Sequence, residues 1–212
     1  PKPLTTTQPI CNAQLDQVAH YRHVTTTFAG VKNVLVATTG YTGAGGIEIY
    51  FDVAQAEKIW KAVMKAGKEF SVLPVGLAAR DTLRLEMGYC LYGNEIDEQT
   101  SPISARLGWV TKPHTGFLNA KLHHKSMEEG TSEKLIGFQI EERGIPRSGY
   151  LFFDTDQNPI GRVTSGTQSP SLNKGIGLGY VKTNFSKPGQ KLSVQIREKF
   201  VSAIVVKLPF IK

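Results

Sequence analysis

The chain has 212 residues, of which 40% are hydrophobic and 20% are charged, and its formal net charge is +7. This apolar fraction suffices for a buried core and excludes an intrinsically disordered polyelectrolyte. No apolar run approaches the roughly 20 residues that a membrane-spanning helix needs, so we predict no membrane protein. Two cysteines without CxxC spacing, Cys11 and Cys90, indicate neither a disulfide framework nor a zinc site and favour a reducing compartment.

The positive charge is concentrated near the end of the sequence. From Lys182 onward there are seven Lys or Arg residues against one Glu198, a local charge of +6. These residues are spread along predicted strands and turns, and no aromatic RNA-binding motif lies between them, so we predict no nucleic-acid binding. Two interpretations stay open: a solvated basic face, or a docking surface for an acidic partner.

Residues 1–7 contain no methionine, no apolar stretch and no arginine-rich amphipathic pattern, so we expect no targeting peptide there. We expect a chain cut from a longer one. Strands are predicted at residues 34–39 and 47–51, on either side of a loop with four glycines at residues 40–46. Asp52 is a predicted cap for a helix over residues 54–66 that ends at Gly67 and has Ile59, Trp60, Val63 and Met64 on one face.

Helical spacing returns over residues 76–87, with Ala79, Leu83 and Met87 on one stripe. Residues 114–133 are polar and predict an exposed helix or linker. Beyond a boundary near Thr131, six short alternating segments separated by turn residues predict a small antiparallel barrel or sandwich. The segments are 135–141, 149–154, 160–165, 176–181, 192–197 and 203–208, with residues 156–159 as one hairpin turn.

Glu48 is unusual because it lies inside a predicted strand, directly after the glycine-rich loop. If Ile47, Ile49 and Phe51 face a core, Glu48 faces either solvent or a cleft. A carboxylate held on a strand can accept two parallel N–H donors from a planar heterocycle. The loop itself is not a phosphate-binding loop, because no Gly-Lys-Ser/Thr follows it and a strand, not a helix, comes next.

Three arginines are further candidates for ligand binding. Arg80 and Arg84 are one helical turn apart, which allows either a structural network with Asp81 and Glu86 or a guanidinium fork for a carboxylate ligand. Arg147 ends the stiff turn at residues 143–147, which can present its side chain with little loss of entropy. The histidines show no ligand spacing and no nucleophile–base pair is present, so we predict no metal site and no catalytic residue.

Several segments, taken together, resemble the T-protein of the glycine cleavage system, the aminomethyltransferase family. The similarity extends from about Phe28 to the end of the chain, and its motifs are TGYTG at residues 39–43, GLAARDTLRLE at 76–86, CLYGN at 90–94, TSG at 164–166, GYV at 179–181 and PF at 209–210. The resemblance implies an α+β fold, with a mixed helix/strand folate-binding domain portion followed by a small antiparallel β-barrel domain. It implies domains at 1–91 (second-domain portion), 92–131 (return segment completing the first domain) and 132–212 (barrel).

The resemblance also implies an activity and its site. The family transfers an aminomethyl group from the lipoylated H-protein to tetrahydrofolate, which is a co-substrate, and works in the bacterial cytoplasm or the mitochondrial matrix. Glu48 resembles the pterin-binding glutamate and Arg80 a substrate-contacting arginine, while Tyr41 and Arg147 match further folate-site positions. The resemblance gives the basic C-terminal third a candidate role in docking the acidic H-protein.

The sequence departs from the family at three places. Ala44 and Gly45 stand where an acidic residue often follows TGYTG, and neither the N-terminal portion with its catalytic aspartate nor a C-terminal tail with a ligand-contacting tyrosine is present. We therefore expect this portion alone to be inactive. Two alternatives remain: the C-terminal part of a folate-dependent sarcosine or dimethylglycine dehydrogenase, and a non-catalytic folate-binding or RNA-modification accessory module.

Overall fold

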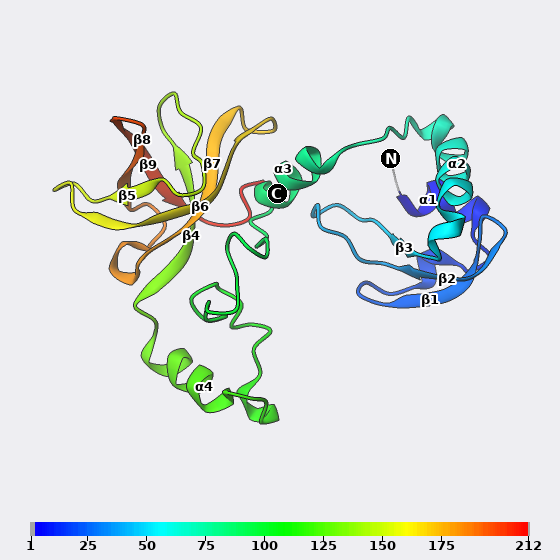
Figure 1. Ribbon diagram of the computed structural model, residues 1–212, viewed down its shortest axis with the longest axis horizontal. Coiled ribbons are helices and arrows are strands. Elements are labelled where there is room, and N and C mark those ends of the chain that lie inside the picture. The colour runs from blue at the N-terminus through cyan, green and yellow to red at the C-terminus, as the bar shows by residue number, and fades with distance from the viewer. Residues whose placement is uncertain (1–2, 212) are drawn as a thin grey trace. The chain divides into compact units, whose positions relative to one another are not determined.

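The computed structural model describes residues 3–211 and is shown as a ribbon in Figure 1. The chain forms two compact units, divided between Leu83 and Arg84. Each unit has its own sheet and its own hydrophobic core. Within residues 3–211, no helix combines the length and apolar character needed to cross a membrane.

The first unit is built on a three-stranded antiparallel sheet in the order β1-β2-β3. Its elements are α1 (Pro3–Thr7), β1 (His23–Phe28), β2 (Val31–Ala37), β3 (Glu48–Tyr50), α2 (Ala56–Gly67) and the start of α3 (Leu77–Glu86), with 3-10 turns at Gln8–Ile10, Leu15–Gln17, Val53–Gln55 and Lys68–Phe70. The two predicted strands are confirmed with shifted bounds. Strand β1 was not predicted, although its Val-Thr-Thr-Thr run has the β-branched content of a strand.

The core of this unit lies between the sheet and α2. Ile59 of α2 is buried and clusters with Val34 and Val36 of β2 and with Phe28 of β1. Burial of one such side chain stabilises the fold by about 1.5–3 kcal/mol. Trp60, which was predicted on the same face, is 56% exposed. The predicted apolar face of α2 is therefore wider than the part of the helix surface that packs against the three strands.

The predicted start of the first helix is confirmed with one refinement. The Asp52 carboxylate accepts a hydrogen bond from the Ala54 backbone N–H at 2.8 Å, as a capping side chain does. The first turn after Asp52 is a 3-10 turn, and the α-helix follows from Ala56 to Gly67.

The buried face of α3 differs from the prediction. Ala79, Leu83 and Met87 were expected to form its buried stripe, but none of them is buried, and Leu83 is 38% exposed. The buried residues of α3 are instead the consecutive Arg84, Leu85 and Glu86. Three consecutive positions point in different directions around a helix, so the end of α3 is enclosed on several sides.

The second unit holds the exposed helix α4 (Ala120–Glu129) and a closed six-stranded barrel. Every strand pair of the barrel is antiparallel, and β4 closes the circle by pairing with β9. The predicted antiparallel barrel is thus confirmed. Its strands follow the order β4-β7-β6-β5-β8-β9 and are β4 (Glu133–Ile140), β5 (Leu151–Phe153), β6 (Pro159–Ser169), β7 (Lys174–Lys182), β8 (Lys191–Ile196) and β9 (Lys199–Val206).

Glycines on β7 give the barrel interior its shape. The rings of Phe138 and Phe152 meet edge to face inside the barrel, with centroids 4.8 Å apart. A Cβ on Gly177 would lie 2.6 Å from the Phe138 ring, and a Cβ on Gly179 would lie 2.5 Å from the Phe152 ring. The alternating glycines therefore make room for the two aromatic rings that fill the core.

We predict that Gly179→Ala destabilises the barrel by about 1–3 kcal/mol, because the new methyl group would overlap Phe152 and the carbonyl oxygen of Arg162. Urea unfolding followed by circular dichroism measures the loss. Gly76→Ala is the matched control, since nothing lies within 4 Å of a Cβ at that position. Equal unfolding midpoints for the two variants would contradict the packing argument.

Candidate functional site

The predicted site residues fall into two local groups. Tyr41, Glu48 and Arg80 belong to the first unit, and Arg147 belongs to the second. Contacts within the first unit orient Glu48 and Arg80, and packing within the second unit fixes the turn that carries Arg147.

The glycine-rich loop between β2 and β3 is anchored at its first residues. The buried Thr38 hydroxyl donates to the carbonyl oxygens of Ala19 at 2.6 Å and Arg22 at 3.1 Å. The next residue, Thr39, donates its hydroxyl proton to the Glu48 carboxylate in a very short hydrogen bond. The loop is thus tied at both of its ends, even though four of its residues are glycine.

Glu48 is the first residue of β3 and pairs with Ala37 of β2. Its side chain is half-buried, and Thr39 bonds to Oε2 only, so Oε1 has no other hydrogen-bond partner in the described residues 3–211. Each carboxylate oxygen can accept two hydrogen bonds. The group is therefore held in place by Thr39 and keeps acceptor capacity on both oxygens for a ligand.

Tyr41 and Arg80 lie next to each other in the fold, and this contact could not be predicted from the sequence. The Arg80 guanidinium carbon lies 5.0 Å from the centre of the Tyr41 ring. Such a cation–π contact contributes about 0.5–1 kcal/mol at an exposed position, and it fixes the direction of a long side chain. Arg80 is exposed and Tyr41 is half-buried, so the pair presents a guanidinium edge and an aromatic ring at the surface of this unit.

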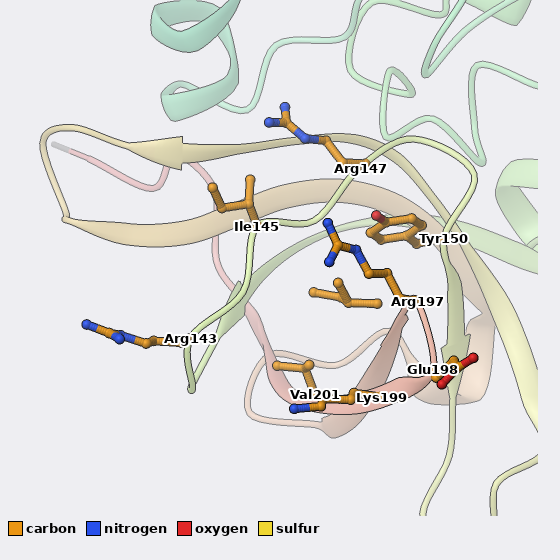
Figure 2. Close-up of a pocket in the computed structure, with 9 residues that line it drawn as sticks. Arg143, Ile145, Arg147, Tyr150, Arg197, Glu198, Lys199 and Val201 are labelled. Carbon is orange, nitrogen blue, oxygen red and sulfur yellow. The ribbon is translucent and has the colours of Figure 1, made fainter.

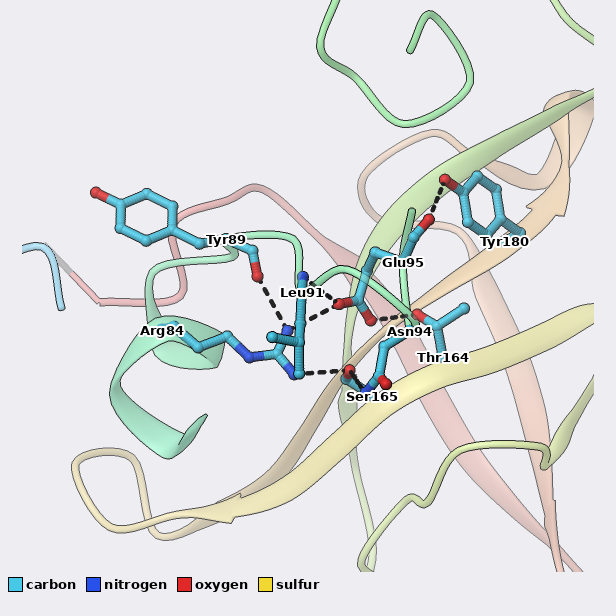
Figure 3. A network of polar contacts seen from close by, with 8 residues as sticks. All are labelled: Arg84, Tyr89, Leu91, Asn94, Glu95, Thr164, Ser165 and Tyr180. Carbon is cyan, nitrogen blue, oxygen red and sulfur yellow. Dashed lines mark hydrogen bonds and ion pairs between the residues drawn. The ribbon is translucent and has the colours of Figure 1, made fainter. Parts of the chain in front are cut away.

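Arg84 does not join Arg80 in a ligand-binding fork, which corrects one of the two interpretations left open by the sequence. Arg84 is 1% exposed, and its guanidinium donates to Glu95 at 2.8 Å, to the Ser165 hydroxyl at 2.8 Å and to the Tyr89 carbonyl oxygen at 3.0 Å (Figure 3). The structural interpretation holds, and the buried carboxylate that pairs with Arg84 is Glu95, a residue that the sequence analysis had not proposed.

Glu95 is the centre of this network and was not among the residues predicted from the sequence. Oε2 accepts from Arg84 and from the Leu91 backbone N–H at 2.9 Å, and Oε1 accepts from the Thr164 hydroxyl at 2.6 Å. Its carbonyl oxygen accepts from the buried Tyr180 hydroxyl at 2.8 Å (Figure 3). The sequence offers one signal for Glu95, because an acidic residue stands directly after the CLYGN motif. When such a carboxylate is buried, it requires hydrogen-bond donors or a positive charge as partners.

A second buried carboxylate, Glu86, is also structural. It accepts from the hydroxyl groups of Ser169 and Ser171 and from the Ser171 backbone N–H at 3.2 Å. Its carbonyl oxygen accepts from the Phe210 N–H at 2.9 Å. Glu86 therefore joins the end of α3 to the β6–β7 turn and to the C-terminal segment.

Cys90, in the CLYGN motif, does not have the character of a nucleophile. Burial, together with the neighbouring Glu95 carboxylate, raises the pKa of its thiol to about 11. The thiolate is the reactive form, and its population at neutral pH is therefore very small. Within residues 3–211, no three His, Cys, Asp or Glu residues are grouped so that they could hold a metal ion.

Arg147 lines a cavity of about 660 Å³ at one end of the barrel (Figure 2). The turn that carries Arg147 is packed tightly: Pro146 is buried, and a Cβ on Gly166 would lie 2.4 Å from its carbonyl oxygen. A Cβ on Gly175 would lie 2.3 Å from the carbonyl oxygen of Gly144. Glycines on β6 and β7 thus allow the turn to lie directly on the barrel, which makes it rigid.

The chain was compared with protein families and with individual proteins. Residues 1–115 match the GCVT N-terminal domain, and residues 133–212 match the glycine cleavage T-protein C-terminal barrel domain. Proteins named aminomethyltransferase from Bacteroides thetaiotaomicron and Flavobacterium psychrophilum are each 50% identical to the chain over its whole length. The chain spans 59% of the length of each of these relatives.

A solved structure is similar as well. The crystal structure of glycine cleavage system aminomethyltransferase T from Bartonella henselae matches with a TM-score of 0.83 at 32% sequence identity. The match covers 92% of this chain and 54% of that protein. Both family matches and this structure agree with the order of a mixed helix/strand portion followed by a barrel.

We predict that Glu95→Gln lowers the free energy of unfolding by about 3–5 kcal/mol, because it removes the buried carboxylate charge that lies 2.8 Å from the Arg84 guanidinium. Chemical denaturation of the purified protein measures this. The matched control is Glu133→Gln, which breaks the exposed pair with Arg162 and should cost less than about 1 kcal/mol. A loss for Glu95→Gln no larger than that of the control would show that the network does not hold the second unit together.

Proposed function

The chain belongs to the glycine cleavage T-protein family, and we propose that it is a portion of a tetrahydrofolate-dependent aminomethyltransferase. In the proposed reaction, the aminomethyl group on a dihydrolipoyl sulfur of the H-protein is transferred to tetrahydrofolate. The C–S and C–NH2 bonds break while the carbon forms bonds to N5 and N10 of the folate. The two protons released from these nitrogens are taken up by the sulfur and by the departing ammonia, which gives 5,10-methylenetetrahydrofolate.

One observation carries this proposal: Glu48 is oriented by Thr39 and keeps acceptor capacity on both carboxylate oxygens. A pterin presents an amino group and a ring N–H along one edge, and a carboxylate is the bidentate acceptor that matches two parallel donors. The Tyr41 ring and the Arg80 guanidinium add a flat apolar surface and a positive charge in the same unit. A planar heterocycle that ends in carboxylates requires these three kinds of group.

Catalysis in this proposal depends on holding two substrates together. In this proposal the described residues contribute by orienting the folate, and the rate enhancement of the complete enzyme comes from orientation and from charges placed near the departing amine. We propose Glu48, Arg80, Tyr41 and Arg147 as folate or substrate contacts, with tetrahydrofolate as co-substrate. The bacterial origin of the relatives supports a cytoplasmic location.

We predict that Glu48→Gln in the complete enzyme weakens tetrahydrofolate binding by about 10- to 100-fold, because one pterin donor then faces an amide N–H. Isothermal titration calorimetry measures the dissociation constant. The control is Glu57→Gln on α2, whose side chain is exposed and pairs only with Lys61 among the described residues. An unchanged dissociation constant for Glu48→Gln would remove this residue from the site.

The lipoylated H-protein is the proposed partner, and the basic C-terminal third of the chain is its proposed docking surface. Lys187 and Lys191 are both exposed and lie at one turn, where the Gln190 N–H donates to the Lys187 carbonyl oxygen at 3.0 Å just before β8. Complementary surface charges accelerate association at low salt.

We predict that Lys187→Glu combined with Lys191→Glu slows association with H-protein several-fold at low ionic strength, and that the difference shrinks as salt is added. Stopped-flow or biosensor measurements of the association rate provide the test. Lys65→Glu on α2 is the control for a change in net charge alone. Equal association rates for the double variant and the wild type would leave the two lysines with a solubilising role only.

A further inference from the structure

The carboxylate of Glu48 is fixed by one hydrogen bond, because the strand that carries it cannot fix the group alone. Rotation about the last bond of a glutamate side chain has a broad profile, so a rigid backbone leaves the plane of the carboxylate undetermined. The Thr39 hydroxyl donates to Oε2 of this carboxylate, and within residues 3–211 no other group donates to either oxygen. Thr39 therefore sets the plane in which Glu48 presents its two acceptors.

The register of β2 and β3 brings Thr39 within reach of Glu48. Ala37 of β2 pairs with Glu48, so Thr39 lies two residues beyond the cross-strand partner of the glutamate. Diagonal neighbours at this spacing can touch when one of the side chains is long. A Cβ on Gly46 would lie 3.8 Å from the Thr39 carbonyl oxygen, so the loop returns to Thr39 just before Glu48. The contact is built entirely within the first unit.

Thr39 follows a residue that is itself held by several hydrogen bonds. The side chain of Thr38 is buried, and its hydroxyl donates to the Ala19 carbonyl oxygen at 2.6 Å. The Thr38 N–H donates to the Arg22 carbonyl oxygen at 2.9 Å, and its own carbonyl oxygen accepts from the Tyr21 N–H at 3.3 Å. The position of Thr39 is thus fixed from a turn that lies before β1.

The backbone of this turn is strained. Tyr21 has φ of +60°, a left-handed conformation that is unusual for a bulky residue. Its side chain is 72% exposed, so burial of the ring does not explain the strain. Its N–H bonds to Thr38, and strained backbone persists where the surrounding contacts fix it. The strained turn is therefore part of the support for Thr38 and, through it, for Thr39.

The plane of the carboxylate decides which ligands can use both of its oxygens. Two parallel N–H donors on one planar edge are matched by a carboxylate that lies in the same plane, which is the geometry of bidentate pairs. A ligand with a single donor needs no shared plane, because one hydrogen bond to an sp² oxygen accepts a broad range of directions. A fixed plane therefore favours ligands with two donors over ligands with one.

We propose that Thr39 is a positioning residue that fixes the plane of the Glu48 carboxylate and makes the site selective for heterocycles with two adjacent N–H donors on one edge. This inference rests on the proposed function, because it takes Glu48 as a contact to the pterin. In tetrahydrofolate the two donors are the 2-amino group and the neighbouring ring N–H. Thr39 does not touch the ligand and acts only through Glu48.

The test compares tetrahydrofolate with the analogue in which hydrogen replaces the 2-amino group, using isothermal titration calorimetry on the complete enzyme. We expect the wild type to bind tetrahydrofolate about 10- to 50-fold more tightly, because the analogue leaves one carboxylate acceptor unpaired. In Thr39→Val, which removes the hydroxyl and keeps the branched shape, this preference should fall to about threefold or less. Thr39→Ser keeps the hydroxyl donor and should retain the preference of the wild type to within about twofold.

Thr82→Val is the matched control. The Thr82 hydroxyl donates to the Ala78 carbonyl oxygen at 3.0 Å within α3, so the same group is removed from the same unit without changing a contact of Glu48. We expect its preference for tetrahydrofolate over the analogue to equal that of the wild type. Equal losses of preference in Thr82→Val and Thr39→Val would show a general effect of removing a hydroxyl and would overturn the proposed role.

The remaining outcomes separate this role from a purely structural one and from the proposed function. If Thr39→Val weakens the binding of both ligands by the same factor, the preference is unchanged and the positioning role is overturned. If the wild type binds the two ligands equally, Glu48 does not receive two donors, and the role is overturned while folate binding stands. If the complete wild-type enzyme binds neither ligand, the proposed folate function fails, and this inference fails with it.

Discussion

Burial of the Arg84 guanidinium is the constraint on which the second unit depends. Removing an arginine from water is costly, and the cost is repaid only when every donor finds a partner in the low-dielectric interior. Here the guanidinium bonds to Glu95, Ser165 and the Tyr89 carbonyl oxygen, and Glu95 in turn uses both of its oxygens. The network joins the end of α3, the segment after it and strand β6. If one of its members lost its hydrogen-bond partner, the full desolvation penalty of a buried charge would no longer be compensated.

The network also explains why several motifs that are far apart in the sequence are found in the same chain. The AARDTLR segment supplies Arg84, the CLYGN segment supplies Leu91 and Asn94 next to Glu95, and the TSG segment supplies Thr164 and Ser165. Several motifs that carried the family resemblance are therefore structural at these positions. The candidate binding residue Arg80 lies in the same motif: it precedes Arg84 by one helical turn and is exposed, whereas Arg84 is buried. Burial, and not residue type, separates the two roles.

The barrel could be predicted from the sequence because its signals are local. Alternating apolar residues and turn residues located all six strands, and the hairpin turn before Pro159 is closed by hydrogen bonds to the Asp154 carboxylate. The buried face of α3 could not be predicted, because helical periodicity cannot show that a helix end is enclosed by a distant strand. The contact of Arg80 with Tyr41 and the partner of Arg84 depend on long-range packing for the same reason.

The candidate binding groups share one physical design, in which a short-range contact orients each side chain before a ligand arrives. Thr39 orients Glu48, the Tyr41 ring orients Arg80, and a tight turn over a buried proline fixes the backbone at Arg147. Preorientation of this kind lowers the entropy lost on binding, and it matters most for long side chains such as arginine. It also makes each group independent of the others.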